Sequence, residues 1–235
     1  MSVSTEKVIL VLANSLKKGG RCVAGVEATL VGDNKYLLGD WIRPVDSSQD
    51  EGTIPNHRIK LLDRTIKPLE LVAIRYTGSA NDAYHPEDMV IDGTAPWVYK
   101  GFMAPSVLNH LVDDTGDLWG AETASSRKVI PKPGTKTLRL IKPKGRCYVT
   151  AFREDTQWGK KNRRKLHIEH QGATHQFSID DPYFSERHKL SPSEVGDRTI
   201  EFELDPTKLV VVASLTKPFV KDGFQYKIAA TIFEL

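Results

Sequence analysis

Cysteine is nearly absent from this chain of 235 residues, which contains only Cys22 and Cys147. Two cysteines without a paired C-x-x-C spacing form neither a disulfide framework nor a structural zinc site. Long hydrophobic runs are also missing, and the apolar run over residues 8–13 is too short for a membrane span or for a secretory signal. We therefore expect a soluble protein of the reducing cytoplasm, in which residues 8–13 form a buried strand.

An excess of one charge is also lacking. The chain has 33 Lys and Arg residues against 30 Asp and Glu residues, a net charge of +3. A surface that binds nucleic acid would therefore have to come from local clustering of cations and not from the charge of the whole chain. The hydrophobic content of 40% excludes intrinsic disorder and is sufficient for one large or two small domains.

Catalytic motifs are absent as well, since the sequence has no nucleophile elbow and no P-loop. His57 and His85, with acidic neighbours, lie in turn-rich sequence, and Cys22 heads an apolar strand where an inert thiol is the commoner outcome. The pairs Asp113-Asp114 and Asp180-Asp181 fit ordinary turn chemistry better than a magnesium site. We expect no enzymatic activity and no cofactor.

Short strands dominate what is present. Gly, Pro, Asn and Asp separate segments of strand-like composition, which predicts an all-β barrel or sandwich. The expected strands, besides residues 8–13, are residues 22–30, 36–43, 69–77, 138–141, 147–153, 165–170, 175–179, 199–204, 209–214 and 226–233. A short helix is predicted after Pro105, because Val107, Leu108, Leu111 and Val112 share one helical face.

Turn-forming residues without periodicity fill residues 124–136, which is typical of a linker. We expect an N-terminal barrel with a helical insert over residues 1–130 and a C-terminal barrel over residues 131–235. Gly20-Arg21-Cys22 and Gly145-Arg146-Cys147 form a weak internal echo, which is explained either by duplication or by coincidence.

The sharpest local feature is a basic segment at residues 157–165, predicted to be a hairpin tip. Cations there neutralise phosphates, and an exposed tryptophan stacks on an unpaired base. The alternative is a solvated hairpin whose charges keep a sheet edge soluble. The candidate residues are Trp158, Lys160, Lys161, Arg163, Arg164 and Lys165.

A second basic cluster surrounds the turn that contains Gly19 and Gly20. Turns of this kind present backbone N–H groups to anions, and a joint anion site forms if neighbouring strands bring the cations together. Its candidate residues are Lys17, Lys18, Arg21 and Arg43. The alternative for Arg43 is an ion pair with Asp40 or Asp46.

Three histidines near one carboxylate, His167, His170 and His175 with Glu169, raise the question of a metal site. Alternation along a strand places His167 and Glu169 on one face and His170 on the other. Too few ligands converge, so we expect surface histidines and no metal.

Several segments together resemble the bacterial dual OB-fold domain proteins. These are residues 12–15, 20–25 and 41–45, followed by residues 85–88, the turn Asp180-Asp181-Pro182, and residues 214–219 and 226–230. Asp180 stands where that family usually has Thr, and residues 170–175 replace a more aromatic hairpin. The resemblance implies two five-stranded barrels and a role in nucleic-acid or nucleotide recognition within bacterial conflict systems. It implies no catalytic residues.

We therefore predict an all-β protein with one or two short helices and two OB-like five-stranded barrels in tandem. Its expected function is non-enzymatic binding of single-stranded or structured nucleic acid through basic loops and stacking aromatics. The alternatives are a sensor of a small nucleotide or modified base, and a protein-interaction adaptor. A hydrolase built on His57 and His85 is a further alternative. No membrane association is expected.

Overall fold

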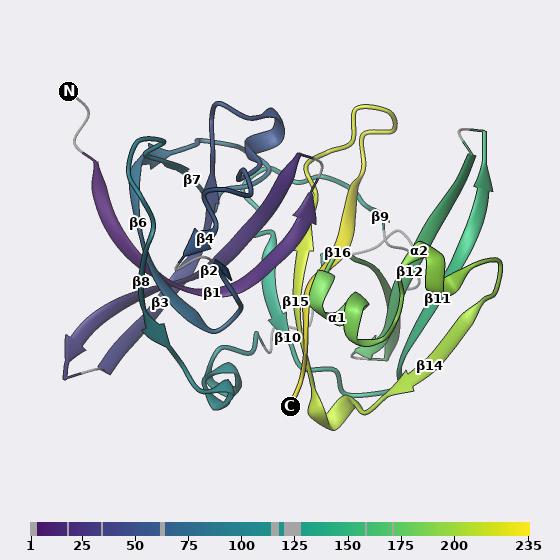
Figure 1. Cartoon of the computed structure of the whole chain (residues 1–235). Coiled ribbons are helices and arrows are strands. Elements are labelled where there is room, and N and C mark those ends of the chain that lie inside the picture. The colour runs from purple at the N-terminus through teal and green to yellow at the C-terminus, as the bar shows by residue number, and fades with distance from the viewer. Residues whose placement is uncertain are drawn as a thin grey trace. The chain divides into compact units, whose positions relative to one another are not determined.

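The computed structural model describes residues 4–17, 19–33, 35–61, 64–113, 118–119, 128–157, 159–170 and 172–235. The chain forms two compact units (Figure 1). The first comprises Met1–Val107 and Gly134–Lys136, and the second comprises Leu108–Pro133 and Thr137–Leu235. This division differs from the single boundary expected after residue 130, because the chain returns briefly to the first unit. There the Gly134 N–H donates to the Ala83 carbonyl at 2.7 Å.

The first unit contains a closed barrel of five strands, which we call the first barrel. Its strands follow the order β1-β2-β3-β7-β6, and β6 pairs with β1 to close the barrel. β3 and β7 are parallel, and the other neighbouring pairs are antiparallel. The strands are β1 (Thr5–Lys17), β2 (Gly20–Gly32), β3 (Lys35–Val45), β6 (Glu70–Ser79) and β7 (Asp88–Ile91).

Smaller elements complete the first unit. β8 (Val98–Phe102) adds to β6 outside the closed ring. The connection from β3 to β6 contains the 3₁₀ turn η1 (Asp50–Gly52) and the short pair β4 (Lys60–Leu61) and β5 (Arg64–Thr65). The barrel is therefore closed by its own five strands, and the extra elements lie between or beside them.

Close backbone approach explains one glycine of the sequence block at residues 20–25. A Cβ atom at Gly25 would lie 2.2 Å from the Leu10 carbonyl oxygen, a distance that no side chain tolerates. Gly25 thus lets β2 cross close to β1, where Val11 and Val23 join one hydrophobic cluster. This part of the block is a requirement of packing.

The second unit repeats the strand order with one change, and we call it the second barrel. β10 pairs with β15, β15 with β16, β16 with β13 in parallel, β13 with β12, and β12 with β11. β10 and β11 together take the place of β1, since β1 pairs with β2 and β6 as a single strand. The strands are β10 (Leu138–Ile141), β11 (Cys147–Thr156), β12 (Gly159–His170), β13 (Ala173–Ile179), β15 (Leu209–Leu215) and β16 (Gln225–Glu234).

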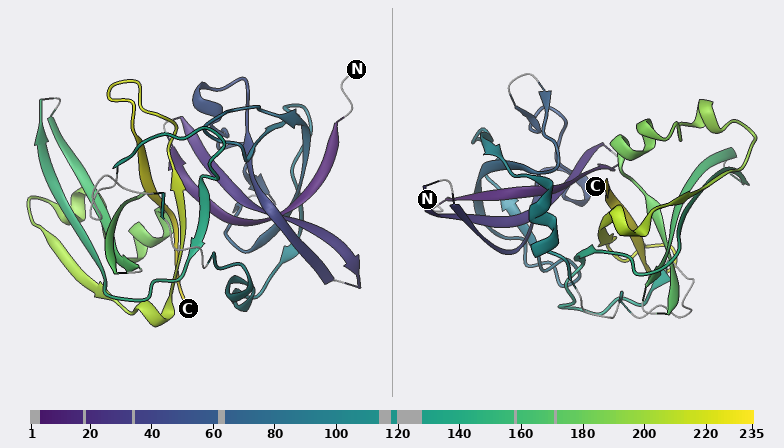
Figure 2. Two further views of the ribbon diagram at one scale, coloured as in Figure 1. Left: turned by 180° about the vertical axis from the view of Figure 1, so that it is seen from behind. Right: turned by 90° about the horizontal axis from the view of Figure 1, so that it is seen from below.

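Short elements surround the second barrel. β9 (Lys128–Val129) pairs with β16, and β14 (Ile200–Leu204) pairs with β11. The helices α1 (Pro182–Arg187) and α2 (Pro192–Val195) lie outside the strands (Figure 2). The 3₁₀ turns are η2 (Pro105–His110), which starts in the first unit, and η3 (Pro206–Lys208).

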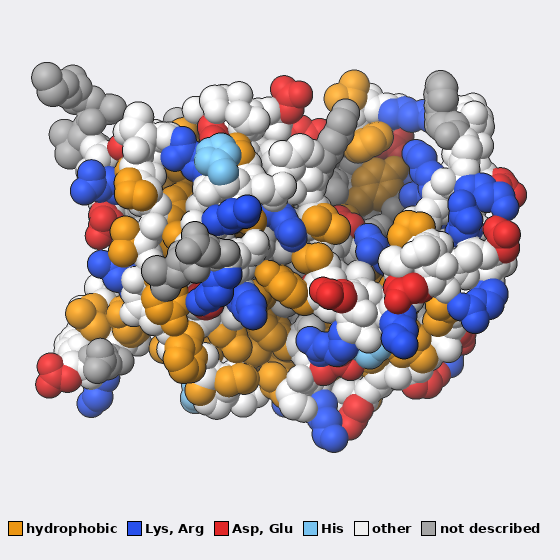
Figure 3. Space-filling model, viewed as in Figure 1, with side chains coloured by type: hydrophobic (Ala, Val, Ile, Leu, Met, Phe, Trp, Pro, Cys, Tyr) orange, Lys and Arg blue, Asp and Glu red, His pale blue; other side chains and the backbone are white. Residues whose placement is uncertain are grey.

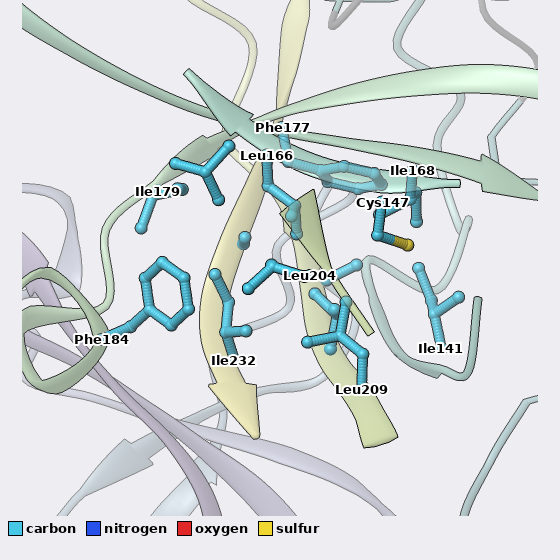
Figure 4. Packing of buried hydrophobic residues seen from close by; sticks show 14 of the residues in the cluster. Ile141, Cys147, Leu166, Ile168, Phe177, Ile179, Phe184, Leu204, Leu209 and Ile232 are labelled. Atoms are coloured by element: carbon cyan, nitrogen blue, oxygen red, sulfur yellow. The ribbon is translucent and has the colours of Figure 1, made fainter. Parts of the chain in front are cut away.

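Alternation of apolar side chains builds the core of the second barrel. Leu166 and Ile168 of β12 point toward Phe177 of β13, and Phe184 of α1 packs beside Ile232 of β16 (Figure 4). Asp181 fixes α1 because its Oδ1 accepts hydrogen bonds from the Tyr183 and Phe184 N–H groups, at 2.9 and 3.1 Å. Its Oδ2 accepts from the Ile232 N–H at 2.8 Å, which ties the helix start to β16.

The predicted strands all overlap observed strands, so the all-β prediction with two five-stranded barrels is confirmed. The helix predicted after Pro105 is the 3₁₀ turn η2. The echo between Gly20-Arg21-Cys22 and Gly145-Arg146-Cys147 does not mark equivalent positions, because Gly20 starts the second strand of its barrel and Gly145 precedes the second half of the first strand of its own. Within the described ranges, no helix is long and apolar enough to cross a membrane.

Candidate nucleic-acid interface

The basic segment after residue 156 is a strand and not a loop, which corrects the sequence prediction. β11 extends to Thr156, β12 begins at Gly159, and Thr156 pairs with Gly159 across the turn. The expectation of a long basic tip is therefore wrong, because backbone pairing continues almost to the turn. Trp158, the predicted stacking residue, lies outside the described residues.

Strand alternation divides the five predicted cations of β12 between two faces. Lys160 and Arg164 share the face of the buried Leu166. The opposite face, which we call the outer face, carries Lys161, Arg163 and Lys165. A loop would have allowed all five to converge, whereas the strand does not.

Some of these cations are engaged within the chain. Lys160 Nζ lies 2.9 Å from an Asp197 carboxylate oxygen, and Arg163 Nη2 lies 2.7 Å from Glu154 Oε2. Burial raises the pKa of Asp180 to about 6, and the charge of Arg164 acts in the opposite direction. Lys161 is exposed at the outer end of the strand. Lys160 and Arg164 thus interact with acidic residues of the second barrel, whereas Lys161 is exposed to solvent.

Planar side chains line the outer face beside these cations. The Tyr148 and His167 rings stack in parallel, with centroids 4.3 Å apart and an interplanar angle of 2°. The Arg146 guanidinium lies 4.5 Å from the centroid of the Tyr148 ring. Thr150 Oγ1 and His167 Nε2 are 3.0 Å apart, a hydrogen bond that orients the imidazole. The outer face therefore holds a fixed row of planar groups.

A second aromatic and cation pair extends this row along the strands. Lys165 Nζ lies 5.2 Å from the centroid of the Phe152 ring, within the range of a cation–π contact. Burial lowers the pKa of His167, and the positive charges of Lys165 and Arg146 lower it further. The imidazole in the row is therefore neutral near pH 7, and the positive charge of the outer face comes from its Lys and Arg side chains.

The sequence contains a signal for this row, although the row was not predicted. Arg146, Tyr148, Thr150 and Phe152 alternate with buried Cys147, Val149 and Ala151, so period two places them all on one face. Sequence reasoning identified the cations of β12 but not the aromatic residues of β11 that lie opposite them.

The loop between β15 and β16 borders the same end of the second barrel as the β11–β12 turn (Figure 1). Phe219 in this loop is 55% exposed, and its ring makes an edge contact with Tyr226 at 6.0 Å. Lys128 Nζ lies 4.8 Å from the centroid of the Phe224 ring. Figure 3 shows Lys and Arg side chains, with Asp and Glu among them, over the side of the molecule where β11 and β12 lie.

The basic turn of the first barrel is arranged differently from the prediction. β1 extends to Lys17, so Asn14 and Ser15 are buried strand residues and not part of a loop. Lys17 Nζ donates to the Glu51 carbonyl at 2.7 Å and lies 3.5 Å from the Glu51 carboxylate. Lys18 lies outside the described residues. The charge of Lys17 is therefore directed to Glu51 of the same chain.

Arg21 and Gly20 also contact the β3–β6 connection. The Arg21 N–H donates to the Ile54 carbonyl at 2.9 Å, and the Ile54 N–H donates back to Arg21. A Cβ atom at Gly20 would lie 2.3 Å from the Ile54 carbonyl oxygen. The glycine is required for contact with the β3–β6 connection, which explains its presence without an anion.

Arg43 is buried and does not join an open anion site. It is 3% exposed, and its Nη1 donates to Asp88 Oδ1 at 3.0 Å. The partner is Asp88 and not Asp40 or Asp46, because parallel pairing places Asp88 opposite Arg43. His85 Nδ1 lies 3.6 Å from the other Asp88 oxygen, and burial together with Arg43 lowers the pKa of His85. This group is a structural charge cluster.

The histidines considered for metal binding do not converge. His167 lies in the outer-face stack, whereas His170 and His175 are buried and meet edge to face at 6.5 Å. His175 Nδ1 lies 3.2 Å from the Nζ of Lys227, a cation. Within the described ranges, no group of three or more His, Cys, Asp or Glu residues is placed to hold a metal ion.

The candidate nucleophiles give no activated group. Burial raises the pKa of the Cys147 thiol to about 12. Cys22 is partly exposed at the start of β2. Asp181 is committed to capping α1, and Asp113 Oδ2 accepts from the Leu140 N–H at 3.0 Å. These acids hold backbone in place.

Comparison with known proteins adds one finding. No curated protein and no solved structure matches the chain. The family model of the dual OB-containing domain matches residues 7–232, nearly the whole chain. The match spans both units, and the strand order of each is that of a five-stranded Greek-key barrel. The chain therefore belongs to the family of proteins with a dual OB-containing domain.

Proposed function

We propose that this protein binds single-stranded nucleic acid on the outer face of its second barrel, without catalysing a reaction. The observation that carries the proposal is the row of planar groups on that face, in which the Tyr148 ring lies 4.5 Å from the Arg146 guanidinium and 4.3 Å from the His167 ring. OB-folds use the face of their second and third strands, with the neighbouring loops, for oligonucleotides. β12 and β13 occupy those positions here.

The chemistry of the face suits an unpaired strand. Aromatic side chains stack on any base, and each such contact contributes about 1–3 kcal/mol. Phe152, which Lys165 contacts, supplies a second aromatic surface four residues beyond Tyr148 along β11. Lys161 adds positive charge near the turn, where a phosphate backbone gains from cations, whereas Glu154 balances the charge of Arg163. The bases of duplex DNA are stacked on one another, so a duplex would bind only through attraction between its phosphates and the cations.

Phe219 extends the proposed interface to the β15–β16 loop. The loop borders the end of the barrel at which β11 and β12 turn, and loops in this position flank OB-fold ligands (Figure 1). We assign the module to bacterial conflict systems of the cytoplasm, on the basis of the sequence resemblance.

The test is fluorescence-polarisation binding of labelled single-stranded and duplex oligonucleotides over a salt series. Tyr148→Ala and Phe152→Ala are expected to weaken single-strand binding by about 5-fold to 150-fold, the equivalent of 1–3 kcal/mol. Phe102→Ala is the matched control, since Phe102 is an aromatic residue of the first unit that is 74% exposed.

Two results would contradict the proposal. One is single-strand binding that is too weak to saturate in low salt. The other is equal loss of affinity in Tyr148→Ala and Phe102→Ala, because the outer face would then have no special role. A decrease in duplex binding as large as the decrease in single-strand binding would exclude base stacking as the mechanism.

A further inference from the structure

A hollow of about 750 Å³ lies in the second unit. Its volume is within the range of pockets that bind small molecules, about 300–1,000 Å³. The β10–β11 connection lines it through Lys142, Pro143 and Lys144, and η3 lines it through Pro206 and Thr207. Asn109, Val112, Asp113 and His170 complete the lining.

The hollow exists because the first strand of this barrel is interrupted. Pro143 has no N–H group and cannot continue the ladder between β10 and β11. Asp113 holds one wall, since its N–H donates to the Leu140 carbonyl at 2.8 Å and its carboxylate accepts from the Leu140 N–H. An Asx turn holds the other wall, where Thr207 N and Oγ1 donate to Asp205 at 2.9 and 2.7 Å.

Charge and polarity in the hollow have a definite pattern. Lys142 is half-buried and Lys144 is exposed, and both lysines line the hollow. Asn109 and Thr207 supply neutral hydrogen-bonding groups at the rim, and His170, 2% exposed, contributes a ring to the lining. Val112, Pro143 and Pro206 supply apolar surface. Asp113 is the acidic member, and one of its oxygens already accepts a backbone hydrogen bond.

We propose that this hollow binds a phosphate monoester carried on a hydroxylated molecule, a nucleoside monophosphate or a sugar phosphate. A phosphate monoester has a charge of about −1.5 to −2 near pH 7, which matches two lysines. The Asp113 carboxylate disfavours a second anionic group and accepts a hydroxyl or amino donor of the carrier. The apolar wall accommodates the face of a sugar or base.

The hollow is separate from the proposed nucleic-acid face. Lys144 and His170 lie close in sequence to Arg146 and His167, at the end of β11 and β12 that is opposite to the β11–β12 turn. His167 of the outer face and His170 of the hollow project from opposite faces of β12. Binding at the hollow therefore goes beyond the proposed function and is measured independently of it.

The experiment is isothermal titration of the full chain with adenosine 5′-monophosphate, ribose 5-phosphate, adenosine and inorganic phosphate. A monophosphate is expected to bind at least about tenfold more tightly than adenosine or inorganic phosphate. The double substitution Lys142→Ala with Lys144→Ala is expected to lower the affinity for the monophosphate by about tenfold or more. Lys221→Ala, in the exposed β15–β16 loop, is the matched control and leaves affinity unchanged.

A second variant tests the location without removing charge. Asn109→Trp places a large side chain at the rim of the hollow and is expected to abolish saturable binding, and thermal unfolding verifies that the variant is folded. Comparison of 5′-phosphorylated with 5′-hydroxyl oligonucleotides in the Tyr148→Ala background separates a strand end from a free nucleotide as the source of the phosphate.

The proposal is overturned if neither monophosphate saturates at about 1 mM, the weak limit of a specific small-molecule site. It is also overturned if the double lysine variant and Asn109→Trp bind as the unmodified chain does. Loss of oligonucleotide binding in Tyr148→Ala, with monophosphate binding retained, supports two separate sites. If the unmodified chain binds oligonucleotides but neither monophosphate, this inference is contradicted and the proposed function is left intact.

Discussion

The two barrels share one strand order but use their charged side chains differently. In the first barrel Arg43 and Asp88 form a buried ion pair, and Lys7 and Glu27 pair across neighbouring strands at 2.8 Å. In the second barrel Arg146 and Lys165 lie over aromatic rings on a half-buried outer face. Charges in the first barrel hold strands together, whereas several in the second are placed where a ligand can reach them.

Continuity of the first strand is the other difference. β1 runs unbroken through 13 residues, with a register shift between Val11 and Ala13. The corresponding strand of the second barrel is divided between β10 and β11, and the gap borders the hollow. In β1 the irregularity is a register shift within one strand. In the second barrel it is a break between β10 and β11, and this break leaves space for the hollow. Both proposed sites lie in the barrel that departs more from a regular ring.

The largest expected effect tests the structural use of charge in the first barrel. Arg43→Met leaves the Asp88 carboxylate buried without its partner, and we expect a loss of about 3–5 kcal/mol in the free energy of unfolding. Arg146→Met breaks the exposed pair with Glu203 and should cost much less stability, because solvent screens an exposed ion pair. Urea unfolding of both variants measures the difference. Equal losses in the two variants would contradict the view that charged residues hold the first barrel together more than the second.

Asp181→Ala tests whether the second barrel also depends on one buried carboxylate. The change removes both hydrogen bonds through which Asp181 caps α1, and it leaves the Ile232 N–H without its acceptor. We therefore expect a loss of about 2–4 kcal/mol in the free energy of unfolding. Asp205→Ala removes an exposed cap of η3 and serves as the control, with a smaller expected loss of stability. Thermal unfolding compares them, and similar melting temperatures would show that the link to β16 contributes little.

Asp180→Asn tests a cost of burial in the second barrel. Because burial raises the pKa of this carboxyl from 3.8 to about 6, the folded state binds its proton more tightly than the unfolded state does. Its contribution to stability therefore falls as pH rises from about 4 through 6. The Asn variant should be more stable at pH 7.5, by at most about 3 kcal/mol, with the gain lost near pH 4. A gain that does not change between these pH values would exclude titration of Asp180 as its cause.

The smallest effect distinguishes two adjacent lysines on opposite faces of β12. Lys161→Ala should weaken oligonucleotide binding uniformly and reduce the salt slope by about 1, as expected for one lost phosphate contact. Lys160→Ala removes an ion pair with Asp197 and should leave the salt slope unchanged. Binding at several salt concentrations measures both. If the two variants behave alike, the outer face does not define the interface.

Local sequence predicted most strands because apolar alternation and turn residues are local properties. Residues 138–141 were predicted with the observed bounds of β10, and the other expected strands overlap observed ones. The short strands β7 and β8 were not predicted. The helix α2 was not predicted either, although Ser191 and Glu194 form a capping box, which is a sequence signal for a helix start.

Partners across strands were not predictable in the same way. Arg43 has Asp40 and Asp46 near it in sequence, but the parallel pairing of β3 with β7 places Asp88 opposite it. The stack of Tyr148 on His167 likewise depends on the register of β11 with β12. Register is a relation between two segments, so neither segment encodes it alone.

Composition and the period-two pattern were sufficient to predict an all-β chain with buried strands and a cationic segment at β12. The reason is that the alternation of buried and exposed side chains is a local property of the sequence. Which cations remain available, which aromatic rings stack and where a hollow opens depended on tertiary structure. Those properties arise when closed barrels bring together residues that are distant in sequence. Lys160 pairs with Asp197, and Lys142 and Thr207 line the same hollow.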